Sequence, residues 1–272
     1  MSDLHVGYRE NRQMVERVRP GSPDDWLIVA GDVAEHADEV LAVLAGVRER
    51  FSAVIWTPGN HDLWTRPSDP LRLRGEERYR YLVNGCRQIG VLTPEDSFPV
   101  WDGPGGPATI APLFALYDYS FRVDEVTTLE QALTRARQAG VVCADEHLLH
   151  PDPYPDRQSW CRARVSATEE RLSACDPTVP LVLVSHWPLI REPTRALFFQ
   201  DFAQWCGTIL TAGWHRRYPT AVAVYGHLHI PRFTVHDGVP FHEVSLGYPR
   251  EWARRPSPPR IPRVILPPPE GR

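Results

Sequence analysis

Short apolar runs alternate with a segment of helical periodicity near the N-terminus. The runs DWLIVA at residues 25–30 and AVIWT at residues 53–57 are continuous, and each is followed by a turn that contains glycine, as expected of buried strands. Between them, residues 35–51 carry apolar side chains at helical spacing, at Val40, Leu41, Val43, Leu44 and Val47. A strand, a helix and a second strand in this order predict a βαβ unit of a parallel or mixed sheet.

The same pattern returns in the second half of the chain. Further buried strands are expected at the short apolar runs of residues 181–185, 221–225 and 241–245. Helices are expected near residues 9–19, 79–89, 129–139 and 158–174. Strands and helices that alternate in this way predict an α/β fold.

The chain has 272 residues, a length that fits one large domain. We expect a core domain at residues 1–255, with less regular insertions near residues 64–90 and 121–157. Residues 256–272 are rich in proline, which predicts an extended tail, more typical of a tether or a strap than of an active element.

Composition and charge narrow the class of protein. The hydrophobic fraction of 42% and the charged fraction of 24% are those of an ordinary globular protein. The formal net charge of −4 disfavours a protein whose main task is to bind nucleic acid or an anionic membrane, although a local basic groove stays open as an alternative. All 30 basic residues are arginine, so a lysine Schiff base and a P-loop are excluded.

The five cysteines are widely spaced and form no C-x-x-C pair, which argues against a disulfide framework and against a thiolate zinc site. No apolar run reaches the length of about 18 residues that a membrane-spanning helix needs, and no signal segment is recognised at the start. We therefore expect a cytoplasmic protein without a membrane partner.

Side chains with metal-binding chemistry follow the predicted strands. They occupy a D-x-H motif, a G-D pair, a G-N-H-D motif, a single strand-end histidine and a G-H-x-H motif, and they are Asp3, His5, Asp32, Asn60, His186, His227 and His229. Because open α/β sheets place their sites at the carboxyl ends of strands, we expect these side chains to converge there.

Imidazole, carboxylate and amide ligands together suit Mn, Fe or Zn. Seven such groups are too many for one tetrahedral ion, whereas two ions that share a bridging carboxylate account for all of them. Two metal ions side by side are a known device for in-line displacement at phosphorus. The pattern therefore predicts a dinuclear metal centre that hydrolyses phosphate esters.

In this order the motifs resemble those of the calcineurin-like metallophosphoesterase family, and they span residues 3–229. The resemblance implies a four-layer α/β/β/α sandwich of two mixed sheets, with the metal site at the carboxyl ends of the strands. It also implies a first metal held by Asp3, His5 and His229, a second held by Asn60, His186 and His227, and a bridging Asp32.

The resemblance further implies a reaction. A hydroxide between the two ions would attack phosphorus, and His61 would stabilise the developing charge or protonate the leaving oxygen, with its ring oriented by Asp62. We therefore expect an enzyme that hydrolyses a phosphate ester of a small molecule, while the sequence identifies no substrate-binding residue. The alternatives are a cyclic-nucleotide or other phosphodiesterase, a nuclease, and a catalytically silent scaffold of the same fold.

Several residues stand apart from the motifs. Only Met1 and Ser2 precede D-x-H, where the family has a whole strand, so we expect a native segment upstream.

His147 is a candidate substrate contact, and Arg191 and Arg195 are candidates to clamp a second phosphate or a carboxylate. We expect surface or capping roles for the other histidines outside the motifs, His36, His150, His215, His236 and His242.

Overall fold

The computed structural model of the chain describes residues 1–125, 128–255, 257 and 259–267, and it contains two sheets. The smaller sheet pairs β1 (Trp26–Val29) with β2 (Ala53–Trp56) in parallel. The larger sheet has the order β3-β4-β5-β6-β8-β7, with β3 (Val100–Trp101), β4 (Ala108–Pro112), β5 (Leu181–Val184), β6 (Thr220–Tyr225), β7 (Arg232–His236) and β8 (Val239–Glu243). Its four central strands are parallel and the two edge strands antiparallel, so this sheet is mixed.

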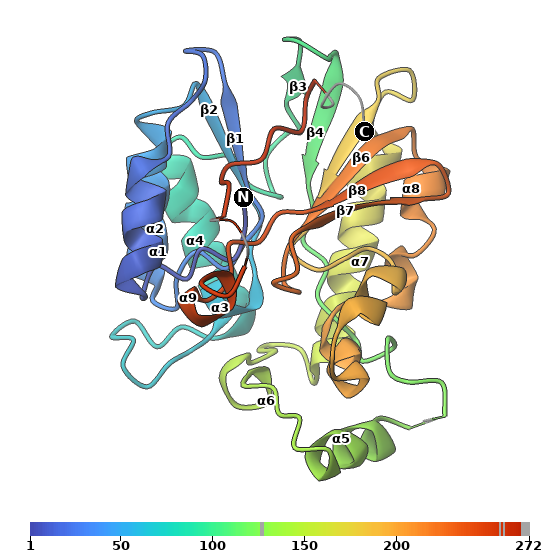
Figure 1. Cartoon of the computed structure of the whole chain (residues 1–272). Coiled ribbons are helices and arrows are strands. Elements are labelled where there is room, and N and C mark those ends of the chain that lie inside the picture. The colour runs from blue at the N-terminus through green and yellow to red at the C-terminus, as the bar shows by residue number, and fades with distance from the viewer. Residues whose placement is uncertain (126–127, 256, 258, 268–272) are drawn as a thin grey trace.

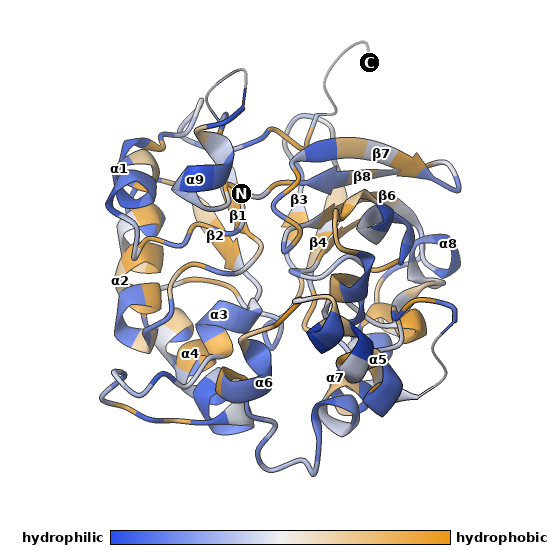
Figure 2. Cartoon of the chain, turned by 60° about the horizontal axis from the view of Figure 1, so that its bottom comes forward, coloured by the Kyte–Doolittle hydropathy of each residue, from blue (hydrophilic) through white to orange (hydrophobic). Residues whose placement is uncertain are grey.

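Helices cover the outer face of each sheet (Figure 1). Beside β1 and β2 lie α1 (Arg9–Arg17), α2 (Ala37–Arg48) and α4 (Gly75–Gln88), and beside the larger sheet lie α7 (Arg157–Ser173) and α8 (Trp214–Arg217). The remaining α-helices are α3 (Asn60–Leu63), α5 (Leu129–Gln138), α6 (Asp145–Leu148) and α9 (Pro249–Trp252). The predicted α/β fold with two sheets is confirmed, and α2 and α4 show hydrophobic and hydrophilic residues side by side, as amphipathic helices do (Figure 2).

Alternation along the strands builds two separate cores. Ile55 of β2 and Val182 of β5 point between the sheets, where they pack in one apolar cluster. Their neighbours Val54 and Leu183 point the other way, into the core beneath the helices. Strands buried on both faces explain why these sequences are continuous apolar runs instead of alternating ones.

The first residues of the chain join the two sheets. The backbone N–H of Ala30 donates to the carbonyl of Met1 (2.9 Å), while Ser2 donates to Val244 (3.1 Å) and accepts from Leu246 (2.8 Å). The segment therefore lies between β1 and the chain that follows β8. This placement carries Asp3 to the edge at which β1, β2 and β6 end.

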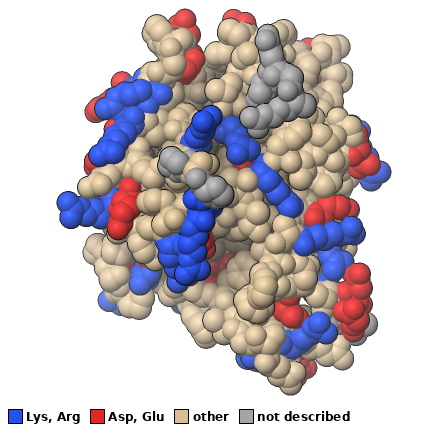
Figure 3. Space-filling view, in the orientation of Figure 1, with Lys and Arg blue, Asp and Glu red and all other residues tan. Residues whose placement is uncertain are grey.

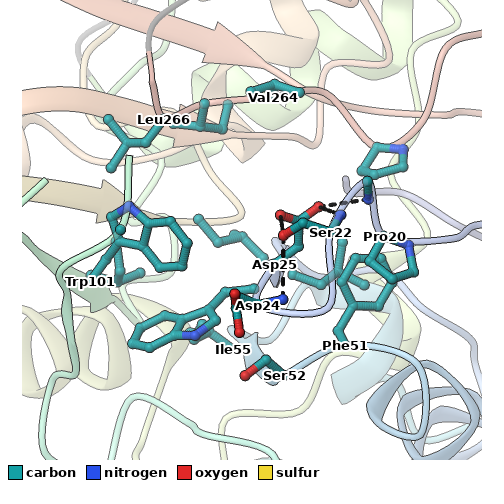
Figure 4. Close-up of a pocket in the computed structure, with 18 of the residues that line it drawn as sticks. Pro20, Ser22, Asp24, Asp25, Phe51, Ser52, Ile55, Trp101, Val264 and Leu266 are labelled. Atoms are coloured by element: carbon teal, nitrogen blue, oxygen red, sulfur yellow. Dashed lines mark hydrogen bonds between the residues drawn. The ribbon is translucent and has the colours of Figure 1, made fainter. Parts of the chain in front are cut away.

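The proline-rich tail packs against the fold. Ile265 and Leu266 contact the apolar cluster between the sheets, and they border a cavity of about 850 Å³. Figure 4 shows Leu266 and Val264 on one side of this cavity, with Trp101 and Ile55 facing them. The described part of the tail is thus a strap that belongs to the core, while the boundary at residue 255 stays a prediction.

Two expectations about single residues have different outcomes. All five cysteines are free thiols, as expected. His215 and His242 are buried, not at the surface, because the ring of His215 packs edge-on against Phe241 and that of His242 against Phe233. The described part of the chain contains no helix that is long and apolar enough to cross a membrane.

Candidate metal centre

The seven predicted ligands meet at the carboxyl ends of the strands, each in the segment that follows a strand or, for Asp3 and His5, at the start of the chain. Five of them have a left-handed backbone, with φ values of 53° at Asp3, 40° at His5, 54° at Asp32, 70° at His227 and 56° at His229. Non-glycine residues rarely adopt this conformation, and they concentrate at functional sites. The backbone is therefore strained at these five residues, and this conformation turns their side chains toward one point.

Glycines allow the segments to approach closely. A Cβ atom on Gly59 would lie 2.1 Å from Asp32 Oδ1, and one on Gly226 would lie 2.3 Å from Asp3 Oδ2. Gly31 also needs its φ of 84°. The glycines of the motifs are thus required chiefly by the contact between ligand segments, a reason that the sequence spacing did not reveal.

The first group of predicted ligands contains Asp3, His5 and His229, whose donor atoms lie close enough together to hold a metal ion. The Nε2 atoms of His5 and His229 are 3.1 Å apart, and His229 Nε2 is 3.1 Å from Asp3 Oδ1. Asp3 is held in place because its Oδ2 accepts hydrogen bonds from Ser245 Oγ (2.6 Å) and from the backbone N–H of His227 (3.0 Å). Three donor atoms thus face a common point.

The second group contains Asn60, His186 and His227. Asn60 Oδ1, His186 Nε2 and His227 Nδ1 form a triangle in which each of the three distances is 3.1 Å. Two donors that each lie about 2.1 Å from one ion, at right angles, are about 3.0 Å apart. The spacing of both groups of predicted ligands therefore fits coordination of a transition-metal ion.

Asp32 lies between the two groups. Its Oδ2 is 3.5 Å from His186 Nε2 in the second group and 3.9 Å from His5 Nε2 in the first. Its Oδ1 accepts a hydrogen bond from the backbone N–H of His61 (2.8 Å). A fully buried carboxylate between two imidazoles fits a bridging ligand, and the whole set fits two ions of Mn, Fe or Zn.

Burial keeps most of these imidazoles ready to coordinate. It lowers the pKa of His5, His186 and His227, so their neutral rings offer a free nitrogen lone pair. His229 differs, because Asp3 and Glu251 outweigh the effect of burial and raise its pKa to about 10. A proton bound to the His229 ring nitrogen that faces the site has to leave when a metal cation binds to that nitrogen.

Partners behind the ligands fix their orientation. Asn60 Nδ2 donates to Asp145 Oδ1 (2.9 Å), which also accepts from Trp64 Nε1 (2.6 Å). His186 Nδ1 lies 2.9 Å from the carbonyl of Ala30. These contacts leave Asn60 Oδ1 and His186 Nε2 turned toward the second group.

A C-terminal element supports the first group in the same way. Glu251 of α9 places Oε2 2.8 Å from His229 Nδ1, and it accepts a hydrogen bond from the backbone N–H of Tyr248 (2.9 Å). The Tyr248 ring stacks on His5 with ring centroids 4.6 Å apart. Sequence reasoning missed Asp145, Tyr248 and Glu251, which lie outside the motifs and carry no local signal.

His61 lies at the mouth of the site. Its Nε2 is 3.8 Å from Asp32 Oδ2, its ring packs on Trp64 at 3.6 Å, and its Nδ1 is 3.4 Å from Glu35 Oε1. Glu35 also pairs with Arg66. Glu35, which the sequence analysis did not single out, is therefore the carboxylate beside this ring.

The predicted orientation of His61 by Asp62 is wrong. Asp62 instead accepts hydrogen bonds from the backbone N–H groups of Asp32 (3.0 Å), Val33 (2.8 Å) and Gly59 (3.0 Å). Asp62 therefore holds together the loop that contains Asp32 and the loop that contains Gly59, which explains its position in the motif. Burial raises the pKa of Asp62 to about 6, although these N–H groups act in the opposite direction.

Two further candidates lie outside the metal site. Arg191 forms an ion pair with Asp124 of the second insertion, so its charge already has a partner. His147 is exposed in α6, two residues after Asp145. Neither observation tests a contact with substrate, and both assignments stay predictions.

Comparisons with known proteins identify the family and a close relative of this chain. A family model described as calcineurin-like phosphoesterase matches residues 1–231. A curated relative from Mycobacterium tuberculosis, described as [acyl-carrier-protein] phosphodiesterase PptH, is 54% identical over 270 residues, which are 99% of this chain and 83% of the relative.

A solved structure shares the fold. The crystal structure of phosphopantetheinyl hydrolase (PptH) from Mycobacterium tuberculosis matches with a TM-score of 0.93 and 53% identity, over 97% of this chain and 95% of the other. The family model, the curated relative and the solved structure thus indicate the same family. The chain belongs to the calcineurin-like phosphoesterase family and is a metal-dependent enzyme that hydrolyses phosphate esters.

Proposed function

We propose that this enzyme hydrolyses the phosphodiester through which phosphopantetheine is attached to an acyl-carrier protein. The names of the relative and of the solved structure support this substrate, since both matches cover nearly the whole chain. The proposal replaces a free small molecule, the substrate expected from the sequence, with an ester that is bound to a protein.

One observation carries the proposed chemistry. Asp32 Oδ2 lies between two triangles of metal-ligand atoms, 3.5 Å from His186 Nε2 and 3.9 Å from His5 Nε2. We assign Asp3, His5 and His229 to one ion, Asn60, His186 and His227 to the other, and Asp32 to both. Two such cations, of Mn, Fe or Zn, would lower the pKa of water and neutralise charge on the phosphate oxygens.

The side chains of the enzyme supply the remaining steps. Water adds to phosphorus, the bond from phosphorus to the serine oxygen of the carrier breaks, and phosphopantetheine leaves as a monoester. The serine oxygen needs a proton, and the His61 ring, which lies beside Asp32 and Glu35, is placed to deliver it. Asp62 holds the ligand loops that position His61 and Asp32.

The test is direct. The chain, loaded with Mn²⁺, is incubated with holo-acyl-carrier protein, and the carrier is weighed by mass spectrometry. We expect the mass of phosphopantetheine to be lost in a wild-type reaction and retained with Asp32→Asn or His61→Ala. A carrier that stays intact while an aryl phosphodiester is hydrolysed would refute the substrate but not the chemistry.

We further propose that the reaction takes place in the cytoplasm. The five free thiols, four of them buried, fit a reducing compartment. Fractionation of cells that express the tagged chain would test this assignment, and recovery of the enzyme outside the cytoplasm would contradict it.

A further inference from the structure

Arginines are concentrated in one segment next to the metal centre. Residues 249–263, called here the basic segment, contain a single acidic residue, Glu251, against five arginines at positions 250, 254, 255, 260 and 263. The chain as a whole has a formal net charge of −4, so this local excess of positive charge runs against the rest of the molecule. Figure 3 shows basic side chains gathered in the middle of one face, beside a hollow in which acidic atoms are visible.

These arginines are not engaged with carboxylates. Within the part of the chain that the structure describes, none of the five forms an ion pair, whereas Arg12, Arg66 and Arg78 each have an acidic partner. Arg250 and Arg254 are exposed. Free guanidinium groups at the surface can pair with carboxylates of another molecule.

Arg255 and Glu251 of the basic segment contact His229, a predicted ligand of the first metal. Arg255 Nη2 donates to the carbonyl of His229 (3.1 Å), and Glu251 Oε2 lies 2.8 Å from His229 Nδ1. Arg250 lies over the ring of Tyr248 at 5.3 Å, and that ring stacks on His5. Arg250 and Arg255 therefore lie next to side chains of the metal centre, where a macromolecule bound at that centre can meet the exposed arginines of the basic segment.

We propose that the basic segment, through Arg250 and Arg254, docks an acidic surface of the carrier protein around its phosphodiester. This inference rests on the proposed function and adds the place where the protein part of the substrate binds. An enzyme of net negative charge repels an acidic partner over most of its surface, so a local positive patch sets both the orientation and the rate of docking.

The test separates docking from chemistry. The full chain, loaded with Mn²⁺, is assayed with holo-acyl-carrier protein and, separately, with an aryl phosphodiester that is too small to reach the patch. We expect the double variant Arg250→Glu/Arg254→Glu to raise KM for the carrier at least about tenfold, with kcat changed less than about twofold. Turnover of the aryl ester should stay within about twofold, which also shows that the variant folds.

A matched control uses an arginine at the other end of the sheet. Arg17, the exposed last residue of α1, precedes the amino end of β1, whereas Asp32 follows its carboxyl end, so Arg17→Glu should leave both substrates unaffected. The proposal requires carboxylates on the carrier near its phosphodiester, so their reversal to Lys should lower activity with the wild type and restore it with the double variant. Added salt should raise the wild-type KM more steeply than that of the variant.

Each contrary result has its own meaning. An unchanged KM for the carrier in the double variant overturns the docking surface and leaves the proposed function standing. If the double variant instead loses binding of single-stranded DNA while KM for the carrier is unchanged, the patch serves nucleic acid and the proposal is wrong. If the wild type hydrolyses the aryl ester but no carrier at any concentration, the substrate and the docking surface fall together.

Discussion

Asp145 holds Asn60 by a 2.9 Å hydrogen bond from Asn60 Nδ2, and the amide oxygen of Asn60 is thereby turned toward His186 and His227. Asp145 comes from α6 in the second insertion, 85 residues away from Asn60 along the chain. The insertion thus orients a side chain of the second group of predicted ligands.

Removal of the Asp145 carboxylate should weaken the binding of one metal ion and not of the other. In Asp145→Ala the amide of Asn60 and the indole of Trp64 lose their shared acceptor, so we expect affinity at the second group to fall about 10–100-fold. Asp145→Asn keeps an acceptor oxygen and should lose less. Titration of the metal-free chain with Mn²⁺ by calorimetry measures this, and two unchanged binding steps in Asp145→Ala would disprove the positioning role.

Glu251 should support the binding of the other metal ion, at the first group. Its Oε2 lies against His229 Nδ1 and also binds the backbone of Tyr248, so Glu251→Ala frees the His229 ring and should lower affinity at the first group about 10–100-fold. Because Asp145 and Glu251 support different groups, the losses in the double variant should add. A calorimetric titration in which either single variant weakens both steps equally would argue against two separate groups.

Acid should destabilise the fold partly through His242. Burial, with a contribution from Arg263, lowers its pKa to about 4, below the usual value of about 6.5. The unfolded chain therefore binds the proton first as the pH falls, and stability contributed by the neutral ring is lost between about pH 6.5 and 4. Melting temperatures measured across this range should fall less in His242→Gln than in the wild type. Parallel curves for the two proteins would show that His242 does not contribute to the loss of stability in acid.

The tail should contribute to stability without contributing to turnover. Ile265 and Leu266 pack on the cluster between the sheets and border a cavity that is also lined by Asp25 and Ser52, just before β1 and β2. Changing both to Ser should lower the melting temperature by several degrees, since partly buried apolar area is lost. Turnover of an aryl phosphodiester below the melting point should be unaffected, and a large fall in kcat at full metal occupancy would instead connect the tail to the site.

The strands and the seven candidate ligands could be predicted from the sequence because their signals are local. The apolar runs at residues 53–57 and 181–185 match β2 and β5 to within a residue at each end. Each run is followed within three residues by a polar side chain, Asn60 or His186, and a sheet edge brings these together. The strand β7, by contrast, alternates half-buried and exposed residues at an edge, and its sequence RFTVH carries no apolar run.

The supporting contacts could not be predicted, since they depend on which distant segments meet. Asp145 and Glu251 look like ordinary surface carboxylates in the sequence, and only the fold places them behind Asn60 and His229. Asp62 shows the converse, because its neighbour in the motif, His61, suggested a partner that the geometry gives to Glu35. Adjacency in sequence is a poor guide to contact where a tight turn separates two side chains.

The central claim is that Asp32 and two groups of three ligands form one dinuclear centre that hydrolyses a phosphodiester. The most direct measurement titrates metal-free protein with Mn²⁺ and follows hydrolysis of an aryl phosphodiester beside the matching monoester. We predict that activity appears only as a second equivalent binds, that the diester is preferred, and that Asp32→Asn abolishes turnover. Full activity at one equivalent, or activity that survives Asp32→Asn, would contradict the account.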